Sequence, residues 1–340
     1  MAPMRWYLSC REITIGSSDD IYVAAATLSH NTLLVAWESG QVDRLTVDPT
    51  NAEITETTTV LGPSPLKAGL LGVLSCLVSG YNQTVQVSYE LIMERSPNGD
   101  HIYSATPLEV RVFYPDTGDI RQIGNRGEGD WPQARLGCSV GLVGGTLVVV
   151  SGFKPCVVPD GVTVPPSPIP DMWCLDIQCS DSGVRWDRHT IPRRASRTFC
   201  NAGLRPAEMC NAGDCVMVSG ARHTHSLSLA GERRVERVTY VGKAPQLRII
   251  SRTIEVDMDP CICFFFRYVK TNSDPDQYDN LVHMYDRVSG DATLCEPLPY
   301  PEEVTCACMP NPTTMIVVQE ERLLLVELDP ELFNTYTDVD

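Results

Sequence analysis

A strand–turn–strand unit recurs along the chain and limits its fold more than any other sequence feature. Each copy has a short apolar or alternating run, a turn rich in Asp, Pro or Gly, and a second such run. The copies are residues 43–56, 110–123, 172–186 and 282–295. In each, an Asp at the strand end can accept backbone N–H groups of the turn and fix a hairpin. These acids are Asp48, Asp116, Asp176 and Asp286.

Residues 131–186 contain the clearest larger unit. A Pro-x-x-Arg sequence ends at Arg135, an apolar strand ends in Ser151-Gly152, and Trp186 follows a strand that carries an aromatic residue and an Asp. This pattern resembles a blade of the kelch-like β-propeller family, although the chain has Ser-Gly where that family has Gly-Gly. The resemblance implies a ring of four-stranded blades, a fold that serves enzymes, lectins and non-catalytic scaffolds alike.

The predicted fold is therefore an all-β propeller of kelch/WD40-like four-stranded blades. Six blades are expected, with seven as the alternative, because 340 residues divided by six leave about 57 per blade, close to the roughly 50 of kelch repeats. No segment has a sustained apolar repeat with helical period. The blades are expected at 17–60, 67–123, 135–190, 196–243, 247–298 and 303–328, within a single domain 1–330 followed by a short helical turn and an acidic tail at 331–340.

The last predicted blade is one strand short. The N-terminal run 5–15 has no other place in the pattern, so we expect it to pair with the strand containing Leu323–Val326 and to close the ring. Its alternation predicts a half-buried strand with Trp6, Leu8 and Cys10 on one face.

The net charge of the chain indicates which classes of binding partner to expect. Acidic residues outnumber basic ones by 43 to 27, which gives a formal charge of −16. Such a surface repels phosphate backbones and anionic lipids, so nucleic acid is not expected as a partner. It attracts basic proteins or basic tails, although the same charge also serves to keep a large β-protein in solution. Neither a signal-peptide run nor a membrane-spanning run is visible, so a cytoplasmic location without membrane insertion is expected.

The cysteines give no sign of a metal site. In a strand, residues i and i+2 point to the same face, whereas tetrahedral zinc sites usually take their cysteine pairs from turns. Cys261-x-Cys263 and Cys306-x-Cys308 lie in predicted strands and are expected to be buried core residues. Without an export signal, the 14 cysteines are expected to be mostly reduced and free of metal. Zinc and redox roles are the alternatives.

No catalytic constellation stands out. The chain has no P-loop, dinucleotide fingerprint, nucleophile elbow or zinc-protease motif. Residues 179–186 are similar to the Asp-box turn of sialidase-like propellers, but that turn is structural, and a sialidase would also need an arginine triad and a tyrosine nucleophile. The expectation is a non-enzyme without cofactor, with a carbohydrate-binding or hydrolytic propeller as the alternative.

Three long connections form the candidate site. Residues 95–107, 152–171 and 269–279 each join a second to a third strand, so they should gather on one face of the propeller. They supply aromatic and charged side chains of the kind used in specific contacts. The expected protein-binding residues are Asp100, His101, Tyr103, Phe153, Lys154, Asp160, Asp274, Asp276 and Tyr278. The expected function is a non-catalytic interaction scaffold or adaptor, and the alternative is a structural subunit of a large multiprotein assembly.

Overall fold

The computed structural model is built almost entirely from β-strands. It describes residues 3–13, 20–65, 67–80, 83–123, 131–143, 145–158, 167–178, 185–191, 207–208, 210–212, 215–219, 224–228, 235–238, 250–259, 262–270, 278–286, 292–319 and 322–334. Within these ranges one helix occurs, α2 (Glu331–Asn334). It is the short helical turn expected after the last strand, and the residues beyond it lie outside the described part.

Four sheets have four strands each. In their hydrogen-bonded order they are β1 (Tyr7–Ile13), β27 (Leu323–Leu328), β26 (Thr314–Gln319) and β25 (Val304–Asn311); β2 (Tyr22–Ser29), β3 (Thr32–Trp37), β4 (Val42–Asp48) and β5 (Glu53–Leu61); β17 (Cys210–Ala212), β18 (Cys215–Ser219), β19 (Thr224–Ser228) and β20 (Val235–Val238); and β21 (Ile250–Asp259), β22 (Ile262–Lys270), β23 (Tyr278–Asp286) and β24 (Ala292–Cys295).

Two further sheets are larger than the sequence predicted. One contains β6 (Leu70–Gly80), β7 (Gln83–Arg95), β8 (His101–Ala105), β9 (Glu109–Phe113), β10 (Ile120–Ile123) and β13 (Cys156–Val158). The other contains β11 (Ser139–Val143), β12 (Thr146–Val150), β14 (Asp171–Asp176), β15 (Trp186–Thr190) and β16 (Ala207–Glu208). Thus four sheets, rather than six or seven, match the expected four-stranded blade. Two of the extra strands, β8 and β13, come from predicted connections that pair with the sheet instead of remaining loops. The third, β16, lies in the predicted blade 196–243 but pairs with β11 of the preceding sheet.

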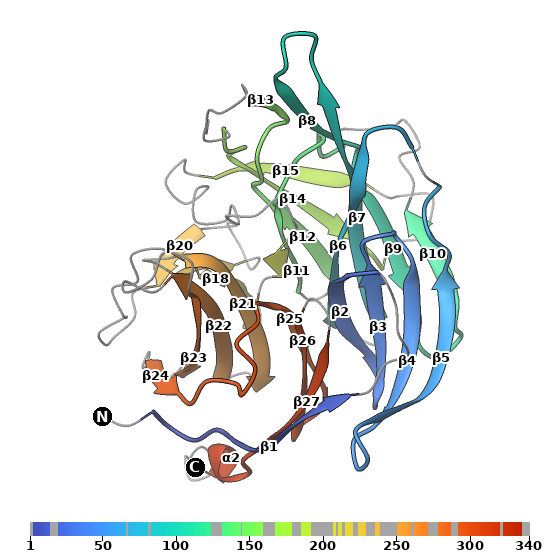
Figure 1. The fold of residues 1–340 in the computed structure, drawn as a ribbon. Coiled ribbons are helices and arrows are strands. Elements are labelled where there is room, and N and C mark those ends of the chain that lie inside the picture. Colours follow the sequence, from blue (N-terminus) through green and yellow to red (C-terminus); the bar gives the residue numbers. More distant parts are fainter. Residues whose placement is uncertain are drawn as a thin grey trace.

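The sheets are arranged like the blades of a propeller (Figure 1). One strand of each sheet contacts one strand of the next: β25 contacts β2, β2 contacts β6, β6 contacts β11, β11 contacts β17, β17 contacts β21, and β21 contacts β25. Apolar clusters fill the spaces between neighbouring sheets. The largest joins Val85 and Val87 of β7 to Val140 of β11 and Leu147 of β12, all fully buried. Each such side chain stabilises the fold by about 1.5–3 kcal/mol relative to exposure to water.

The N-terminal strand pairs with β27, as predicted. β1 runs antiparallel to β27, with Cys10 opposite Val326 and Ile13 opposite Leu323. A register shift between Tyr7 and Ser9 interrupts the pairing. The expectation that Trp6 and Leu8 share a buried face is therefore wrong. Trp6 is fully buried, whereas Leu8 at the irregularity is exposed.

A buried ion pair explains the Pro-x-x-Arg sequence. Arg135 is fully buried, and its Nη1 donates to the Ser151 carbonyl at 2.8 Å and to Asp171 Oδ1 at 2.7 Å. Trp173 Nε1 donates to the other Asp171 oxygen at 2.9 Å. Ser151 and Gly152 have φ of 57° and 101°, a backbone that favours glycine at the second position. A Cβ on Gly152 would also lie 3.1 Å from a backbone oxygen.

The predicted role of the hairpin acids holds for two of the four. Thr50 N donates to Asp48 Oδ1 at 2.8 Å, and Gln178 N donates to Asp176 Oδ1 at 2.9 Å. The bond from Thr50 holds the pKa of Asp48 below its usual value. Asp116 does not fix its turn, because β9 ends at Phe113 and the turn is closed by backbone bonds instead. The turn after Asp286 lies outside the described residues.

Candidate functional site

A β-hairpin projects from the six-stranded sheet at the top of Figure 1. β7 has 13 residues; residues 84–88 pair with β9, and residues 91–95 pair with β8. Ser96 N donates to the Asp100 carbonyl at 2.8 Å and closes the turn between β7 and β8. The segment 95–107, predicted as a loop, is therefore mostly a strand hairpin.

A second predicted connection joins this hairpin. β13 comes from the segment between β12 and β14 of the neighbouring sheet, yet it pairs with β8, with Cys156 opposite Tyr103 and Val157 opposite Ile102. Burial raises the pKa of the Cys156 thiol, which makes it less readily ionised than a free thiol. We call residues 91–105 together with Cys156–Val158 the β-arm. It unites two of the three predicted segments in one small sheet.

Four of the predicted site residues lie wholly or partly outside the described part of the structure. Asp160, Asp274 and Asp276 are not described, and for Tyr278 only the backbone, at the start of β23, is described. The grouping of residues 269–279 with the β-arm thus stays a prediction.

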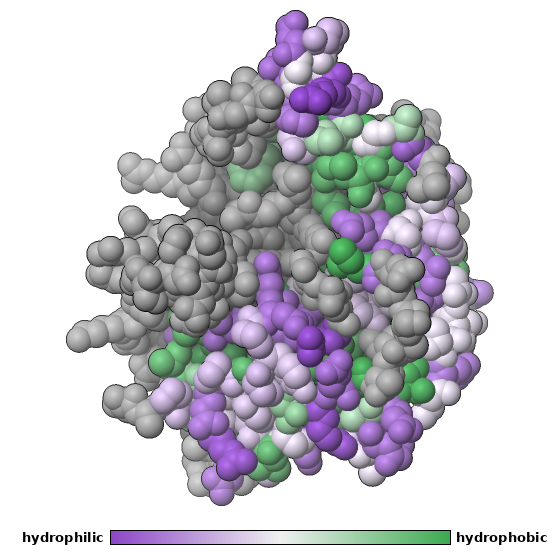
Figure 2. Space-filling model, in the orientation of Figure 1, coloured by the Kyte–Doolittle hydropathy of each residue, from purple (hydrophilic) through white to green (hydrophobic). Residues whose placement is uncertain are grey.

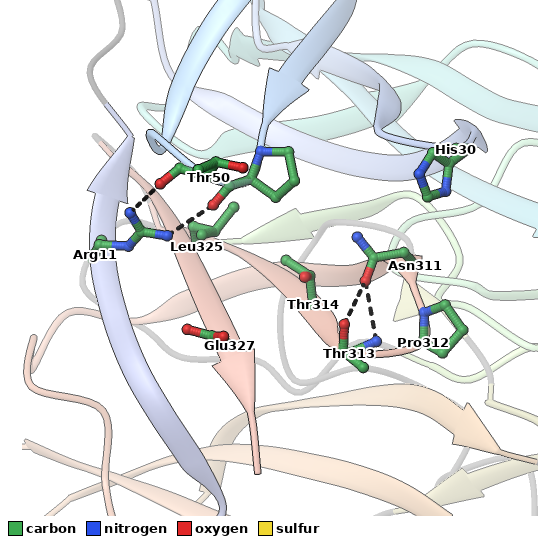
Figure 3. Close-up of a pocket in the computed structure, with 10 residues that line it drawn as sticks. Arg11, His30, Thr50, Asn311, Pro312, Thr313, Thr314, Leu325 and Glu327 are labelled. Carbon is green, nitrogen blue, oxygen red and sulfur yellow. Dashed lines mark hydrogen bonds between the residues drawn. The ribbon is translucent and has the colours of Figure 1, made fainter. Parts of the chain in front are cut away.

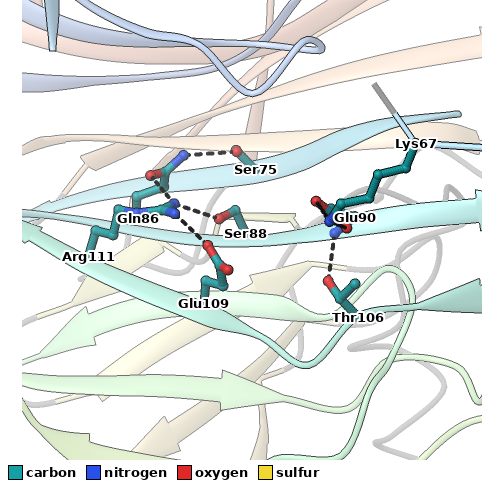
Figure 4. A network of polar contacts seen from close by, with 8 residues as sticks. All are labelled: Lys67, Ser75, Gln86, Ser88, Glu90, Thr106, Glu109 and Arg111. Carbon is teal, nitrogen blue, oxygen red and sulfur yellow. Dashed lines mark hydrogen bonds and ion pairs between the residues drawn. The ribbon is translucent and has the colours of Figure 1, made fainter. Parts of the chain in front are cut away.

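Polar contacts at its base fix the β-arm to the sheet (Figure 4). Glu90 N donates to Thr106 Oγ1 at 2.9 Å, and Thr106 N donates to the Glu90 carbonyl at 3.1 Å. Lys67 Nζ lies 2.6 Å from Glu90 Oε1, and Met93 N donates to the Gly69 carbonyl at 2.8 Å. The exposed ion pair contributes less than about 1 kcal/mol, so the backbone bonds hold the direction in which the β-arm leaves the sheet.

The same view contains a buried network farther along β7 (Figure 4). Gln86, almost fully buried, donates to Ser75 Oγ at 3.1 Å and accepts from Arg111 Nη1 at 3.3 Å. Arg111 also pairs with Glu109 at 2.5 Å. These bonds join side chains of β6, β7 and β9 within one sheet and satisfy their polar groups, so their role is to hold the three strands in register.

The two faces of the β-arm differ in what they contact. Tyr103 and Ala105 lie on one face and pack against the core between the two larger sheets. Strand pairing places Ile92, Ile102 and Val157 on the opposite face, which we call the arm patch. Val157 is 52% exposed, the most exposed large apolar side chain among the described residues. In Figure 2 the β-arm has a hydrophilic tip, and a hydrophobic area lies at its base.

The described charged and aromatic residues of the predicted site have different surroundings. Phe153 is half-buried against the core, and its backbone N donates to the Leu136 carbonyl at 2.7 Å, so it is part of the scaffold. Asp100 lies in the turn and Lys154 is exposed. His101 has its ring 6.4 Å from that of Tyr103, and its Nδ1 is buried without a hydrogen bond to any described residue.

The described residues include no group of three or more His, Cys, Asp or Glu side chains that could hold a metal ion. Cys306 and Cys308 lie in the core between the sheets of β25–β27 and β2–β5, as predicted from their spacing. Across the described ranges, no disulfide links two cysteines. No helix among these residues is long and apolar enough to cross a membrane.

Comparisons with known proteins support the fold and no family. No family model matches the sequence, and no curated protein matches it. Among solved structures, a structural genomics protein of unknown function from Bacteroides thetaiotaomicron VPI-5482 aligns with a TM-score of 0.55 at 11% identity, covering 94% of this chain and 76% of that one. The structure of YjhT aligns with a TM-score of 0.56 at 9% identity, covering 93% and 95%. A streptogramin B lyase aligns at 0.47 and 9% identity, covering 94% and 98%. At these identities the likeness concerns the fold alone.

Proposed function

We propose that this chain is a non-catalytic interaction scaffold that binds a protein partner through the arm patch. One observation carries the proposal: the hairpin of β7 and β8 and the distant segment β13 build a projecting strand platform, and Ile92, Ile102 and Val157 lie together on its outer face, with Val157 52% exposed. Exposed apolar side chains on a rigid support are typical centres of protein contacts. The backbone bonds at the base lower the ordering cost of binding.

The partner is a basic protein. The net charge of −16 attracts positively charged surfaces over a distance and speeds their encounter. Glu94 lies directly opposite Ile102 on the same face of the β-arm and supplies an acidic neighbour to the patch. A cytoplasmic location and a place in a larger complex are part of the same proposal.

The proposal includes a closed six-bladed ring of the kelch-like kind, with the six sheets as its blades, as the frame that carries the β-arm. The contacts between neighbouring sheets run from β25 through β2, β6, β11, β17 and β21 back to β25, and this order favours six blades. The pairing of β1 with β27 favours closure by the two ends of the chain. The buried Arg135–Asp171 pair gives a structural role to Arg135, one of the residues on which the kelch-like resemblance rests.

The test compares the amounts of each protein that the wild-type chain and two variant chains capture. Val157→Asp places a charge at the centre of the arm patch, so recovery of a true partner should fall by about tenfold or more. Leu294→Asp is the matched control, because Leu294 on β24 is similarly exposed at 43%. The captured protein is then purified, and its affinity for the three chains is measured by calorimetry.

A protein that binds the wild type and Leu294→Asp equally but Val157→Asp weakly supports the proposal. Replacing residues 155–166 with a Gly-Ser turn removes β13 and keeps Ile169, which is buried and bonded to Gly152. This change should weaken binding of the same partner and leave the melting transition in place. Equal binding by all chains would rule out the arm patch as the contact surface.

A further inference from the structure

A surface groove of about 620 Å³ lies between the sheet of β1 and β25–β27 and the sheet of β2–β5 (Figure 3). It is separate from the arm patch in sequence and in the strands that form it. Its floor is the buried side chain of Leu325 with Thr314 beside it, and three chain turns form its walls. The volume is in the usual range for sites that bind small ligands or single side chains.

Two of the three turns in the walls of the groove are similar, and hydrogen bonds hold them in place. Asp48-Pro49-Thr50 and Asn311-Pro312-Thr313 each begin with an Asx side chain that accepts the backbone N–H two residues later, at 2.8 and 3.1 Å. Asn311 Nδ2 also donates to Asn31 Oδ1 at 3.2 Å and so connects the two sheets across the groove. A ligand would therefore meet a preformed shape.

Arg11 and Glu327, the two charged side chains of the groove, differ in whether they can contact a ligand. Arg11 Nη1 donates to the Thr50 carbonyl at 2.7 Å and Nη2 donates to the Pro49 carbonyl at 2.8 Å, so the guanidinium is held against the wall. Glu327 is exposed, and its Oε2 accepts from Ser9 Oγ at 3.1 Å. Its Oε1 accepts no hydrogen bond from any residue that the structure describes, and Arg11 forms no ion pair with it there.

We propose that this groove binds the end of a flexible alkyl chain that carries a positive charge, an alkylammonium or alkylguanidinium group. Glu327 receives the charge, and the apolar surface of Leu325, Pro49 and Pro312 covers the methylene stem. The net charge of −16 raises the local concentration of such cations. The same chemistry is offered by a free amine and by a Lys or Arg side chain of another protein.

Binding is measured by ligand-observed NMR with n-pentylammonium as the free amine and the blocked tripeptide Gly-Lys-Gly as the protein source. We expect millimolar dissociation constants for such small probes, with hexanoate and the norleucine tripeptide showing no binding. Glu327→Gln should weaken both cations about tenfold. The control is Glu56→Gln on β5, an equally exposed strand glutamate outside the groove, which should change affinity less than about twofold.

Every outcome of these measurements supports or contradicts the proposal. If Glu327→Gln weakens the binding of both cations, the cation that binds the wild type more tightly identifies the source, a free amine or a protein side chain. Hexanoate binding as tightly as pentylammonium, equal affinities for the wild type and Glu327→Gln, or no binding of either cation would overturn the proposal. An unchanged melting temperature of Glu327→Gln confirms that the fold is intact. Loss of the arm-patch interaction would leave this result untouched, because the two sites share no residue.

Discussion

Replacing Arg135 with alanine is expected to lower the free energy of unfolding by about 3–5 kcal/mol. The side chain is fully buried, and its guanidinium neutralises Asp171, which is 3% exposed. Without it, the Asp171 carboxylate stays buried with Trp173 Nε1 as a donor and Arg188 at 3.5 Å as the nearest remaining cation. Urea denaturation followed by tryptophan fluorescence measures the change.

Arg188→Ala is the matched control for that experiment. Its side chain is 56% exposed and reaches the same carboxylate only at 3.5 Å, so a loss below about 1 kcal/mol is expected. The double variant Arg135→Met with Asp171→Leu removes both buried charges and should recover a large part of the lost stability. A loss for Arg135→Ala no greater than that for Arg188→Ala would show that the pair does not stabilise the sheet.

Local signals explain which parts of the fold could be predicted from the sequence. Asp48 and Asp176 mark hairpins because their carboxylates bond to backbone N–H groups within two residues. The alternation in the N-terminal run predicted a strand, and the missing strand of the last blade predicted its partner. The irregularity at Leu8 was not predictable, because it depends on how β1 meets β27 and the chain beyond it.

The β-arm could not be predicted because its strands depend on distant pairing. Residues 96–100 carry turn residues, and they led to the prediction of a long loop. β7 is longer than β9, and β8 pairs with the part of β7 that β9 does not reach. β13 then pairs with β8 from a segment about 50 residues later in the chain. Sequence patterns report local preference and burial, whereas these contacts are set by the packing of two neighbouring sheets.

The candidate sites were predicted only in part, for the same physical reason. Residues 95–107 and 152–171 were expected to meet, and the described portions do so through β8 and β13. The apolar residues Ile102 and Val157 could not be predicted as site residues, because an exposed apolar side chain cannot be told from a core residue in the sequence. The groove at Glu327 joins residues from both ends of the chain, so no single segment carries its pattern.

Replacing Trp6 with alanine is expected to destabilise the protein by about 3–5 kcal/mol, because a large buried side chain is removed. Trp6 is fully buried, its Nε1 donates to the Glu296 carbonyl at 2.7 Å, and its ring lies 4.8 Å from that of Phe264 on β22. The N-terminal segment thereby connects two sheets, since it also pairs with β27. Thermal unfolding followed by circular dichroism measures the effect.

Leu8→Ala on the same segment is the matched control. Leu8 is 45% exposed, so its truncation should change the free energy of unfolding by less than about 0.5 kcal/mol. Deleting residues 1–15 should destabilise the whole domain, because it opens the edge of β27 and uncovers the pocket that Trp6 fills. If the truncated chain melts at the wild-type temperature, or if Trp6→Ala is as mild as Leu8→Ala, the two ends of the chain do not hold the propeller together. The order of these three effects therefore measures how much of the stability depends on the N-terminal strand, independently of what the molecule binds.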